Sequence, residues 1–238
     1  SLEKESSMRS LSESREREIP FAPYPKLDHL SESACFAAFD LGTTTIVCYL
    51  LDAKSGEQIS VCGMLNPQSA FGADVIARAN QALSGDDPRA LQTCAVSALN
   101  ALMERACADC GRFVQNIVLI TIVGNTVMHH LLLGYPLEKL VRTPYVPYFA
   151  ERQIIQAESL GLVAAKNAVL LLAPVIGGFV GADTVACLSA TAFEQRKKPT
   201  LLLDIGTNGE IALTDGTKRV CCSTAAGPAF EGATISCG

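Results

Sequence analysis

The sequence predicts an α/β protein, and three observations support this prediction. Residues 117–123 form an almost wholly apolar run of strand length, which is typical of strands buried on both faces of a sheet. Residues 88–110 repeat apolar side chains at every third or fourth position, the period of a helix packed on a core. A layout of strand, Gly-Thr turn and two further strands occurs twice, at residues 36–65 and 200–224.

The composition indicates a globular protein with a substantial core. Of the 238 residues, 49% are hydrophobic and 18% are charged, a balance that excludes general disorder. The formal net charge of −5 argues against nucleic-acid binding, which requires clustered positive side chains. No apolar run reaches the roughly 18 residues needed to span a bilayer. We therefore expect no nucleic-acid partner and no membrane association.

The cysteines do not follow the pattern of a disulfide-bonded or metal-binding protein. Most of the 10 stand singly among apolar residues, as buried thiols do in cytosolic proteins, so we expect a cytoplasmic location. Cys107-Ala-Asp-Cys110 has the spacing of metal ligands, but no second pair completes a zinc site. Because no Cys-x4-Cys-x2-Cys spacing occurs, we expect no iron–sulfur cluster bound by these residues.

The elements of the first part follow from apolar runs and helical periodicity. Residues 1–34 are rich in charge and serine and contain prolines, which predicts a linker that is extended or partly helical. Apolar runs bounded by turn residues predict strands at 36–41, 46–52, 58–65, 117–123 and 169–173. Helical spacing predicts helices at 73–83, 88–110, 125–133 and 184–193, the third capped by Asn125 and ended by Gly134.

The second part begins after residue 193 and repeats the opening arrangement. Apolar runs predict strands at 200–205, 210–214 and 219–224. The first two are joined across Gly206-Thr-Asn-Gly209, and the last follows the turn signal Asp215-Gly216. No short-period repeat occurs, so the chain contains one duplicated supersecondary unit.

The two turns, Asp40-Leu-Gly-Thr-Thr-Thr45 and Asp204-Ile-Gly-Thr-Asn-Gly-Glu210, have the chemistry of a phosphate site. Glycine lets the backbone approach an anion, consecutive N–H groups form a concave nest, and hydroxyl groups add donors. Asp40 and Asp204 would lie beside the phosphates, where they can hold Mg²⁺ directly or through water. The residues expected to contact phosphates are Gly42, Thr43, Thr44, Thr45, Gly206, Thr207, Asn208 and Gly209.

A single Asp-x-Gly-Thr segment is also an ordinary hairpin turn. Two copies, each after an apolar strand, favour instead a clamp that holds a polyphosphate from both sides. The Walker pattern Gly-x4-Gly-Lys-[Ser/Thr] is absent, and no Gly-x-Gly-x-x-Gly opens a helix after a strand. The sequence therefore excludes a P-loop enzyme and a Rossmann dinucleotide-binding protein.

These hairpins resemble the two phosphate motifs of the superfamily that unites acetate and sugar kinases, heat-shock ATPases and actin. Gly124-Asn-Thr126 is similar to its first connecting motif. A larger combination of motifs resembles the ATP-dependent reductive activators of corrinoid-dependent methyltransferases, over about residues 36–238. That combination comprises Asn66-Pro-Gln68, Phe71-Gly-Ala-Asp-Val75, the segment 124–134, Gly177-Gly-Phe-Val-Gly-Ala-Asp183, the segment 203–210 and Ala226-Gly-Pro-Ala-Phe-Glu-Gly232.

The resemblance implies an actin-like, ribonuclease H-like ATPase fold. Residues 35–193 would form a complete first lobe, with an inserted segment at about 135–168. Residues 194–238 would begin a second lobe that is truncated before the adenosine motif of the superfamily. We therefore expect the chain alone to bind adenine poorly and to hydrolyse ATP weakly.

The resemblance also implies a function. Such activators use ATP and Mg²⁺ to return Co(II) corrinoid proteins to Co(I), with the electron supplied through an iron–sulfur domain that these residues do not contain. The implied partners are a corrinoid methyl-carrier protein or methyltransferase and an electron donor, and a homodimer stays open. Two alternatives also stay open: a small-molecule kinase of the same superfamily and a non-enzymatic, nucleotide-dependent scaffold.

By the same resemblance, Asp40 and Asp204 organise Mg²⁺ and the attacking water, and Asn125 belongs to the nucleotide site. Asp183 follows a glycine-rich turn and opens a helix, which suits either a general base or a helix N-cap. We expect Glu210 to face solvent and His129-His130 to serve packing or the surface. Asn66 and Asp74 suit caps and turns better than partner recognition.

Overall fold

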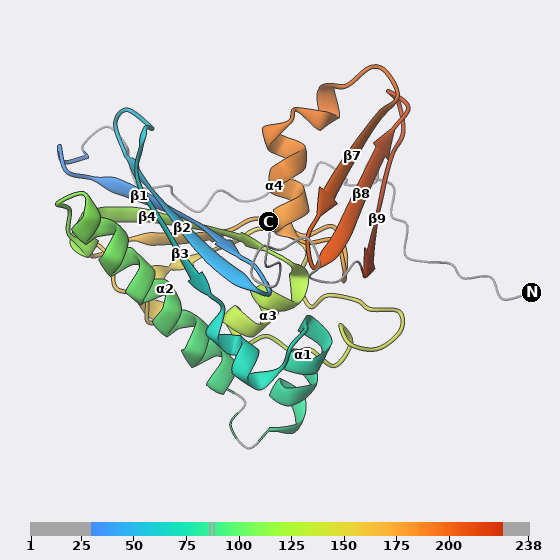
Figure 1. Cartoon of the computed structure of the whole chain (residues 1–238), viewed down its shortest axis with the longest axis horizontal. Helices are drawn as coiled ribbons and strands as arrows, with labels where there is room; N and C mark the ends of the chain where they lie inside the picture. The colour runs from blue at the N-terminus through green and yellow to red at the C-terminus, as the bar shows by residue number, and fades with distance from the viewer. Residues whose placement is uncertain (1–29, 86, 88, 226–238) are drawn as a thin grey trace, which may run out of the picture.

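The computed structural model describes residues 30–85, 87 and 89–225. It has two β-sheets with helices against them (Figure 1). Most of the predicted linker and the segment 226–238 lie outside the described residues, so those predictions stay as they are. None of the described helices combines the length and the hydropathy that a membrane crossing requires.

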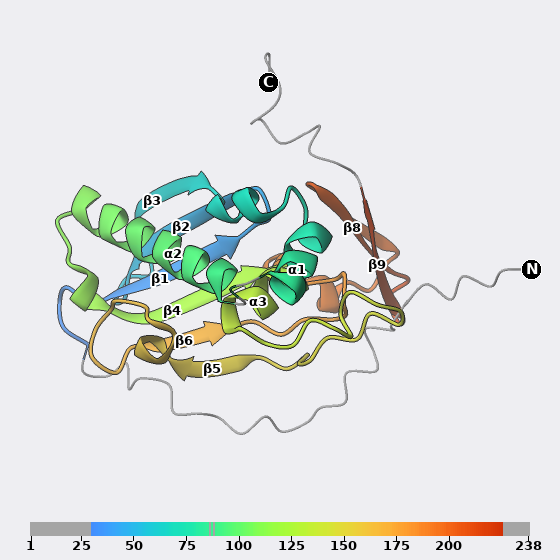
Figure 2. The same cartoon turned by 90° about the horizontal axis from the view of Figure 1, so that it is seen from below.

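The larger sheet has six strands in the order β3-β2-β1-β4-β6-β5 (Figure 2). The strands are β1 (Cys35–Leu41), β2 (Thr45–Asp52), β3 (Gln58–Leu65), β4 (Ile117–Gly124), β5 (Gln153–Gln156) and β6 (Val169–Leu172). β1, β2 and β3 form an antiparallel meander, whereas β4 and β6 continue from β1 in parallel. Five of these strands confirm the prediction within a few residues. β5, which pairs antiparallel with β6 inside the predicted insertion, was not predicted.

The described residues contain four α-helices beside the strands. They are α1 (Val75–Ser84), α2 (Ala90–Asp109), α3 (Thr126–Leu133) and α4 (Ala182–Ala190), with single 3₁₀ turns at Pro67–Phe71, Val114–Asn116, Ala157–Leu160 and Phe193–Gln195. Figure 1 shows α1, α2 and α3 on one face of the sheet, and α4 on the other face, beside the second sheet. The predicted caps are confirmed, because the Asn125 side chain accepts from the Met128 N–H and Gly134 adopts a left-handed conformation after α3.

The main core lies between the larger sheet and α2. Alternate residues of β1, from Cys35 to Leu41, are buried and belong to the same apolar cluster as Leu99 of α2. α2 follows β3 and α3 follows β4 in the chain, and each helix packs back on the sheet. This packing encloses a core with many fully buried aliphatic side chains. This core fixes the end of β1, where the first predicted phosphate turn begins.

The smaller sheet consists of β7 (Thr200–Ile205), β8 (Asn208–Thr214) and β9 (Arg219–Ala225), paired antiparallel in that order. One face packs on α4 through a small cluster around Phe193 and Ala212. The other face of β7 leaves Leu201, Leu203 and Ile205 between 54% and 63% exposed. Among the described residues, the smaller sheet is therefore a thin layer with an uncovered apolar face.

Candidate functional site

The two predicted phosphate hairpins meet at one place. β1 and β7 both end in an Asp-x-Gly-Thr turn, and the hydroxyl oxygens of Thr44 and Thr207 lie 3.2 Å apart, within hydrogen-bond distance. These residues are 163 positions apart in the sequence. The fold therefore brings together the two turns that the sequence singled out.

The first hairpin depends on glycine for a close backbone approach. A Cβ on Gly42 would lie 2.6 Å from the carbonyl oxygen of Thr45, so only glycine fits without a shift of the loop. Thr43 is buried, and its hydroxyl accepts a hydrogen bond of 2.9 Å from the Asn125 side-chain amide. Asn125 thus caps α3 with its oxygen and holds the hairpin with its nitrogen. Thr45 begins β2 with an exposed side chain.

The charge of Asp204 acts on the carboxylate of Asp40 across the site. Asp40 is accessible to solvent, but protein atoms crowd its carboxylate. That desolvation, followed by the negative charge of Asp204, raises the pKa of Asp40. The negative charge of Asp204 disfavours ionisation of Asp40, and a bound divalent cation would relieve that repulsion.

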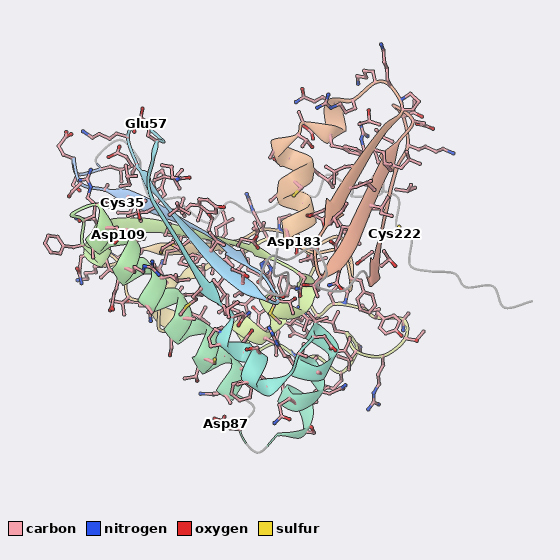
Figure 3. The ribbon with its side chains drawn as sticks, in the orientation of Figure 1. Cys35, Glu57, Asp87, Asp109, Asp183 and Cys222 are labelled. Carbon is pink, nitrogen blue, oxygen red and sulfur yellow. The ribbon has the colours of Figure 1, made fainter. Side chains whose placement is uncertain are left out.

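Asp183 lies at the start of α4, between the ends of the two sheets (Figure 3). The N-cap of this helix is Gly181, so the N-cap interpretation of Asp183 is wrong, and its carboxylate lies within the first helical turn. Burial, and then the charges of Asp40 and Asp204, raise the pKa of Asp183 to about 6. The hydrogen bond from the Thr184 backbone N–H acts in the opposite direction. A carboxylate with such a pKa can accept a proton near neutral pH.

The start of α4 packs directly on the start of α3. A Cβ on Gly181 would lie 2.5 Å from Cα of Asn125 and 2.6 Å from the carbonyl oxygen of Gly124. The Thr126 hydroxyl donates to the carbonyl of Gly177, at 2.6 Å. The glycine-rich segment before α4 therefore lies against the same turn that holds Thr43.

The second hairpin carries a row of polar side chains across its sheet. Asp204, Glu210 and Ser223 are register partners on β7, β8 and β9. The Ser223 hydroxyl donates to Glu210 at 2.9 Å. Burial first, and then the charges of Asp183 and Asp204, raise the pKa of Glu210 to about 7.

The expectation that Glu210 faces solvent is wrong, because its carboxylate is half-buried and belongs to the charged site. The register could have predicted this position, since residues directly opposite each other in an antiparallel pair point to the same face. Gly206 donates its N–H to the carbonyl of Asn208 at 3.1 Å and closes the turn, and Gly209 is buried on β8.

Cys187 is a site residue that the sequence did not indicate. Its thiol donates to a carboxylate oxygen of Asp204, with sulfur and oxygen 3.6 Å apart. Burial, together with the charge and hydrogen bond of Asp204, raises the pKa of Cys187 to about 11. Cys187 follows Asp183 by four residues, so both side chains lie on one face of α4. This spacing could have predicted that Cys187 lies near the site.

The remaining candidates have structural roles. His129 and His130 are both fully buried, so the packing interpretation is confirmed and the surface interpretation is wrong. His130 accepts at Nε2 from the Tyr148 N–H, at 2.9 Å. Asn66 and Asp74 cap the 3₁₀ turn Pro67–Phe71 and helix α1, as expected. All nine cysteines within the described segments are free thiols.

A metal would need ligands beyond those of the protein. Within the described ranges, no three His, Cys, Asp or Glu side chains form a group that could hold a metal ion. Mg²⁺, however, is usually held by one or two carboxylates together with substrate phosphates and water. The carboxylates of Asp40 and Asp204 fit that kind of site, because the charge of Asp204 acts on Asp40 and each residue lies beside a hairpin suited to phosphate.

The chain matches two family descriptions. Residues 36–196 match "RACo middle region", and residues 198–238 match "C-terminal domain of RACo the ASKHA domain". A solved structure described as "Reductive activator for corrinoid,iron-sulfur protein" superposes with a TM-score of 0.83 and 31% identity. That match covers 88% of this chain and 34% of the solved chain.

Two curated relatives carry similar descriptions. "Corrinoid activation enzyme RamQ" of Eubacterium limosum is 36% identical over 204 residues, which cover 84% of this chain and 34% of that protein. "[Co(II) methylated amine-specific corrinoid protein] reductase" of Methanosarcina barkeri is 39% identical over 82 residues, 34% of this chain and 15% of that protein. The chain spans about a third of the first relative's length. With its actin-like α/β fold, it belongs to the RACo family of reductive activators of corrinoid proteins.

Proposed function

We propose that this chain forms the phosphate-binding and ATP-hydrolysing part of an activator that returns Co(II) corrinoid proteins to Co(I). The observation that carries the proposal is the meeting of the two Asp-x-Gly-Thr hairpins, with Thr44 and Thr207 hydroxyls 3.2 Å apart. The names of the relatives support the corrinoid partner. An electron donor and ATP then supply the electron and the free energy.

In this proposal the hairpins hold the phosphates of ATP from both sides. Backbone N–H groups of residues 42–44 and 207–208 bind the phosphate oxygens, and Asp40 and Asp204 hold Mg²⁺. Mg²⁺ would neutralise the phosphate charge when it is bound. Asp183 accepts the proton of the attacking water, and ADP and phosphate are released.

Binding can be tested on the chain itself. Isothermal titration should detect Mg²⁺-ATP and Mg²⁺-tripolyphosphate, and the Asp204→Ala variant should lose at least tenfold in affinity for both. Asp109→Ala is the matched control, because Asp109 ends α2 at the far end of the larger sheet (Figure 3). Equal affinities in wild type and Asp204→Ala would contradict the assignment of the second hairpin.

Turnover tests the activity. Phosphate release should rise when Co(II) corrinoid protein and a low-potential reductant are added, and the absorbance of Co(I) should appear only with ATP. Asp183→Asn should retain binding and lose turnover, since it removes the proton acceptor alone. A phosphorylated metabolite in place of free phosphate would indicate a kinase instead, and nucleotide-dependent assembly without turnover would indicate a scaffold.

A further inference from the structure

Asn66 lies beneath the first phosphate hairpin and contacts it twice. This residue follows β3 directly and is fully buried. Its backbone N–H donates to the carbonyl of Thr44 at 2.7 Å, and its side-chain amide donates to the carbonyl of Gly42 at 2.8 Å. Its side-chain oxygen accepts from the Gln68 N–H at 3.0 Å and caps the following 3₁₀ turn.

These contacts fix which way the hairpin backbone points. The Gly42–Thr43 peptide is trans, since the single cis bond among the described residues is Thr143–Pro144. In a planar trans peptide the carbonyl and the next N–H point in opposite directions. Because Asn66 holds the Gly42 carbonyl, the N–H of Thr43 points away from Asn66. A phosphate that approached the hairpin from that side would meet this N–H.

We propose that Asn66 is a positioning residue for nucleotide binding, which sets the orientation of the Gly42–Thr43 peptide in the first hairpin. This inference rests on the proposed function, because it assumes that the hairpin binds phosphate. Asn66 itself does not touch the nucleotide. Its cap could be replaced by other polar side chains, but the bond to Gly42 requires a donor at the end of an amide-length side chain.

Two substitutions separate the cap from the positioning bond. Asn66→Asp keeps an oxygen for the Gln68 N–H and replaces the donor to Gly42 by a carboxylate oxygen. Asn66→Ser also keeps a good cap oxygen but is too short to reach Gly42. Both variants should raise the dissociation constant for Mg²⁺-ATP and Mg²⁺-tripolyphosphate at least tenfold.

Gln92→Met is the matched control for loss of a structural amide. The Gln92 side-chain amide donates to the Leu132 carbonyl at 2.9 Å, and this bond joins α2 to α3 without contacting the hairpin. We expect this variant to lower the melting temperature as much as the Asn66 variants while it keeps wild-type affinity. Affinities within twofold of wild type in a folded Asn66 variant would overturn the proposal, and so would an equal affinity loss in Gln92→Met.

The wild-type chain supplies a test that does not depend on a variant folding. On binding Mg²⁺-tripolyphosphate, the Thr43 amide should shift in an ¹⁵N spectrum and exchange at least tenfold more slowly with solvent. An unchanged Thr43 amide in a complex that does form would overturn the role of Asn66. Absence of binding by the wild type, with Asp204→Ala indistinguishable from it, would instead count against the proposed function itself.

Discussion

The two Asp-x-Gly-Thr hairpins carry similar residues but rest on very different amounts of structure. The first lies in the middle of a six-stranded sheet, and two buried or half-buried amides, Asn66 and Asn125, hold its backbone and its Thr43 hydroxyl. The second ends the edge strand β7 of a three-stranded sheet. One face of that strand exposes Leu201, Leu203 and Ile205.

This difference separates what the motif does from what its surroundings do. The motif supplies glycine, hydroxyl groups and a carboxylate at both sites, whereas the rigidity of each site comes from the core behind it. Regions with few buried apolar contacts open at lower free energies than core strands do. We therefore expect the first hairpin to be a preformed half of the clamp and the second to be the half that adapts to the nucleotide.

The largest expected effect compares the two cores. Ile122 of β4 is fully buried in the main core, and Ile122→Ala should lower the free energy of unfolding by about 2–5 kcal/mol. Leu203 of β7 is 54% exposed, and Leu203→Ala should change the free energy of unfolding by less than about 1 kcal/mol. Urea titration measures both. Equal losses would mean that the smaller sheet is as well supported as the larger one.

The second prediction concerns the packing of α4 on α3. Gly181→Ala would place a Cβ 2.5 Å from backbone Cα of Asn125, and we expect a loss of about 1–3 kcal/mol together with weaker phosphate binding. Gly177→Ala is the control, because a Cβ there meets nothing within 4 Å. Thermal unfolding and titration with Mg²⁺-tripolyphosphate should therefore distinguish the two variants. A tolerated Gly181→Ala would show that this contact can relax.

The third prediction concerns acid. Burial, and then the neighbouring His130, lower the pKa of His129 from 6.5 to about 3, so folded His129 stays neutral while the unfolded chain takes up a proton. The contribution of neutral His129 to the free energy of unfolding is complete above pH 6.5. It is lost as the pH falls toward 3, at up to about 1.4 kcal/mol per pH unit. His129→Leu should flatten the decline in urea midpoint between pH 7 and 5.

The control follows from the surroundings of His129. Neither of its ring nitrogens has a hydrogen-bond partner in the part of the chain that the structure describes, so an apolar replacement breaks no such bond. His130 also has a lowered pKa and should leave a residual acid slope in the variant. A slope unchanged from wild type would assign the acid sensitivity to other groups.

The stability contributed by Glu210, beside the second hairpin, should respond to pH in the opposite direction. Because the folded pKa of Glu210 is raised from 4.5 to about 7, its contribution is complete below pH 4.5 and is lost as the pH rises through 7. Glu210→Gln should therefore reduce the loss of stability between pH 6 and 8 in the absence of Mg²⁺. Urea midpoints at both pH values measure this effect. A steeper decline in Glu210→Gln would contradict the burial of its carboxylate among like charges.

The sequence predicted best those features that depend on local pattern. The two hairpins, the cap at Asn125 and the long helix α2 follow from residue types at fixed spacing, and all were found. β5, with only Gln-Ile-Ile-Gln, was missed because its strand character comes from pairing with β6 rather than from its own pattern.

The site was predicted incompletely for a related reason. Glu210 reaches the site through the register of β7 and β8. Cys187 reaches it because its side of α4 faces Asp204 of β7. Asn66 contacts the first hairpin because the end of β3 approaches that hairpin. Each of these three positions depends on how separate segments of the chain pack together. A helical-face or register argument could have found the first two, whereas the third requires the packed fold.

The smallest expected effect concerns the contact that joins the two hairpins. Thr44→Val and Thr207→Val each remove one hydroxyl from the pair that lies 3.2 Å apart, and the double variant completes a cycle. We expect a coupling energy of about 0.5–1 kcal/mol in urea titrations without nucleotide, because the contact is only partly buried and water can compete for both hydroxyls. The cycle cancels other interactions of either residue. With bound Mg²⁺-tripolyphosphate the coupling should fall toward zero, since phosphate oxygens would then separate the hydroxyls. A coupling that persists in the complex would mean that the hairpins stay in contact and that phosphate binds to one side only.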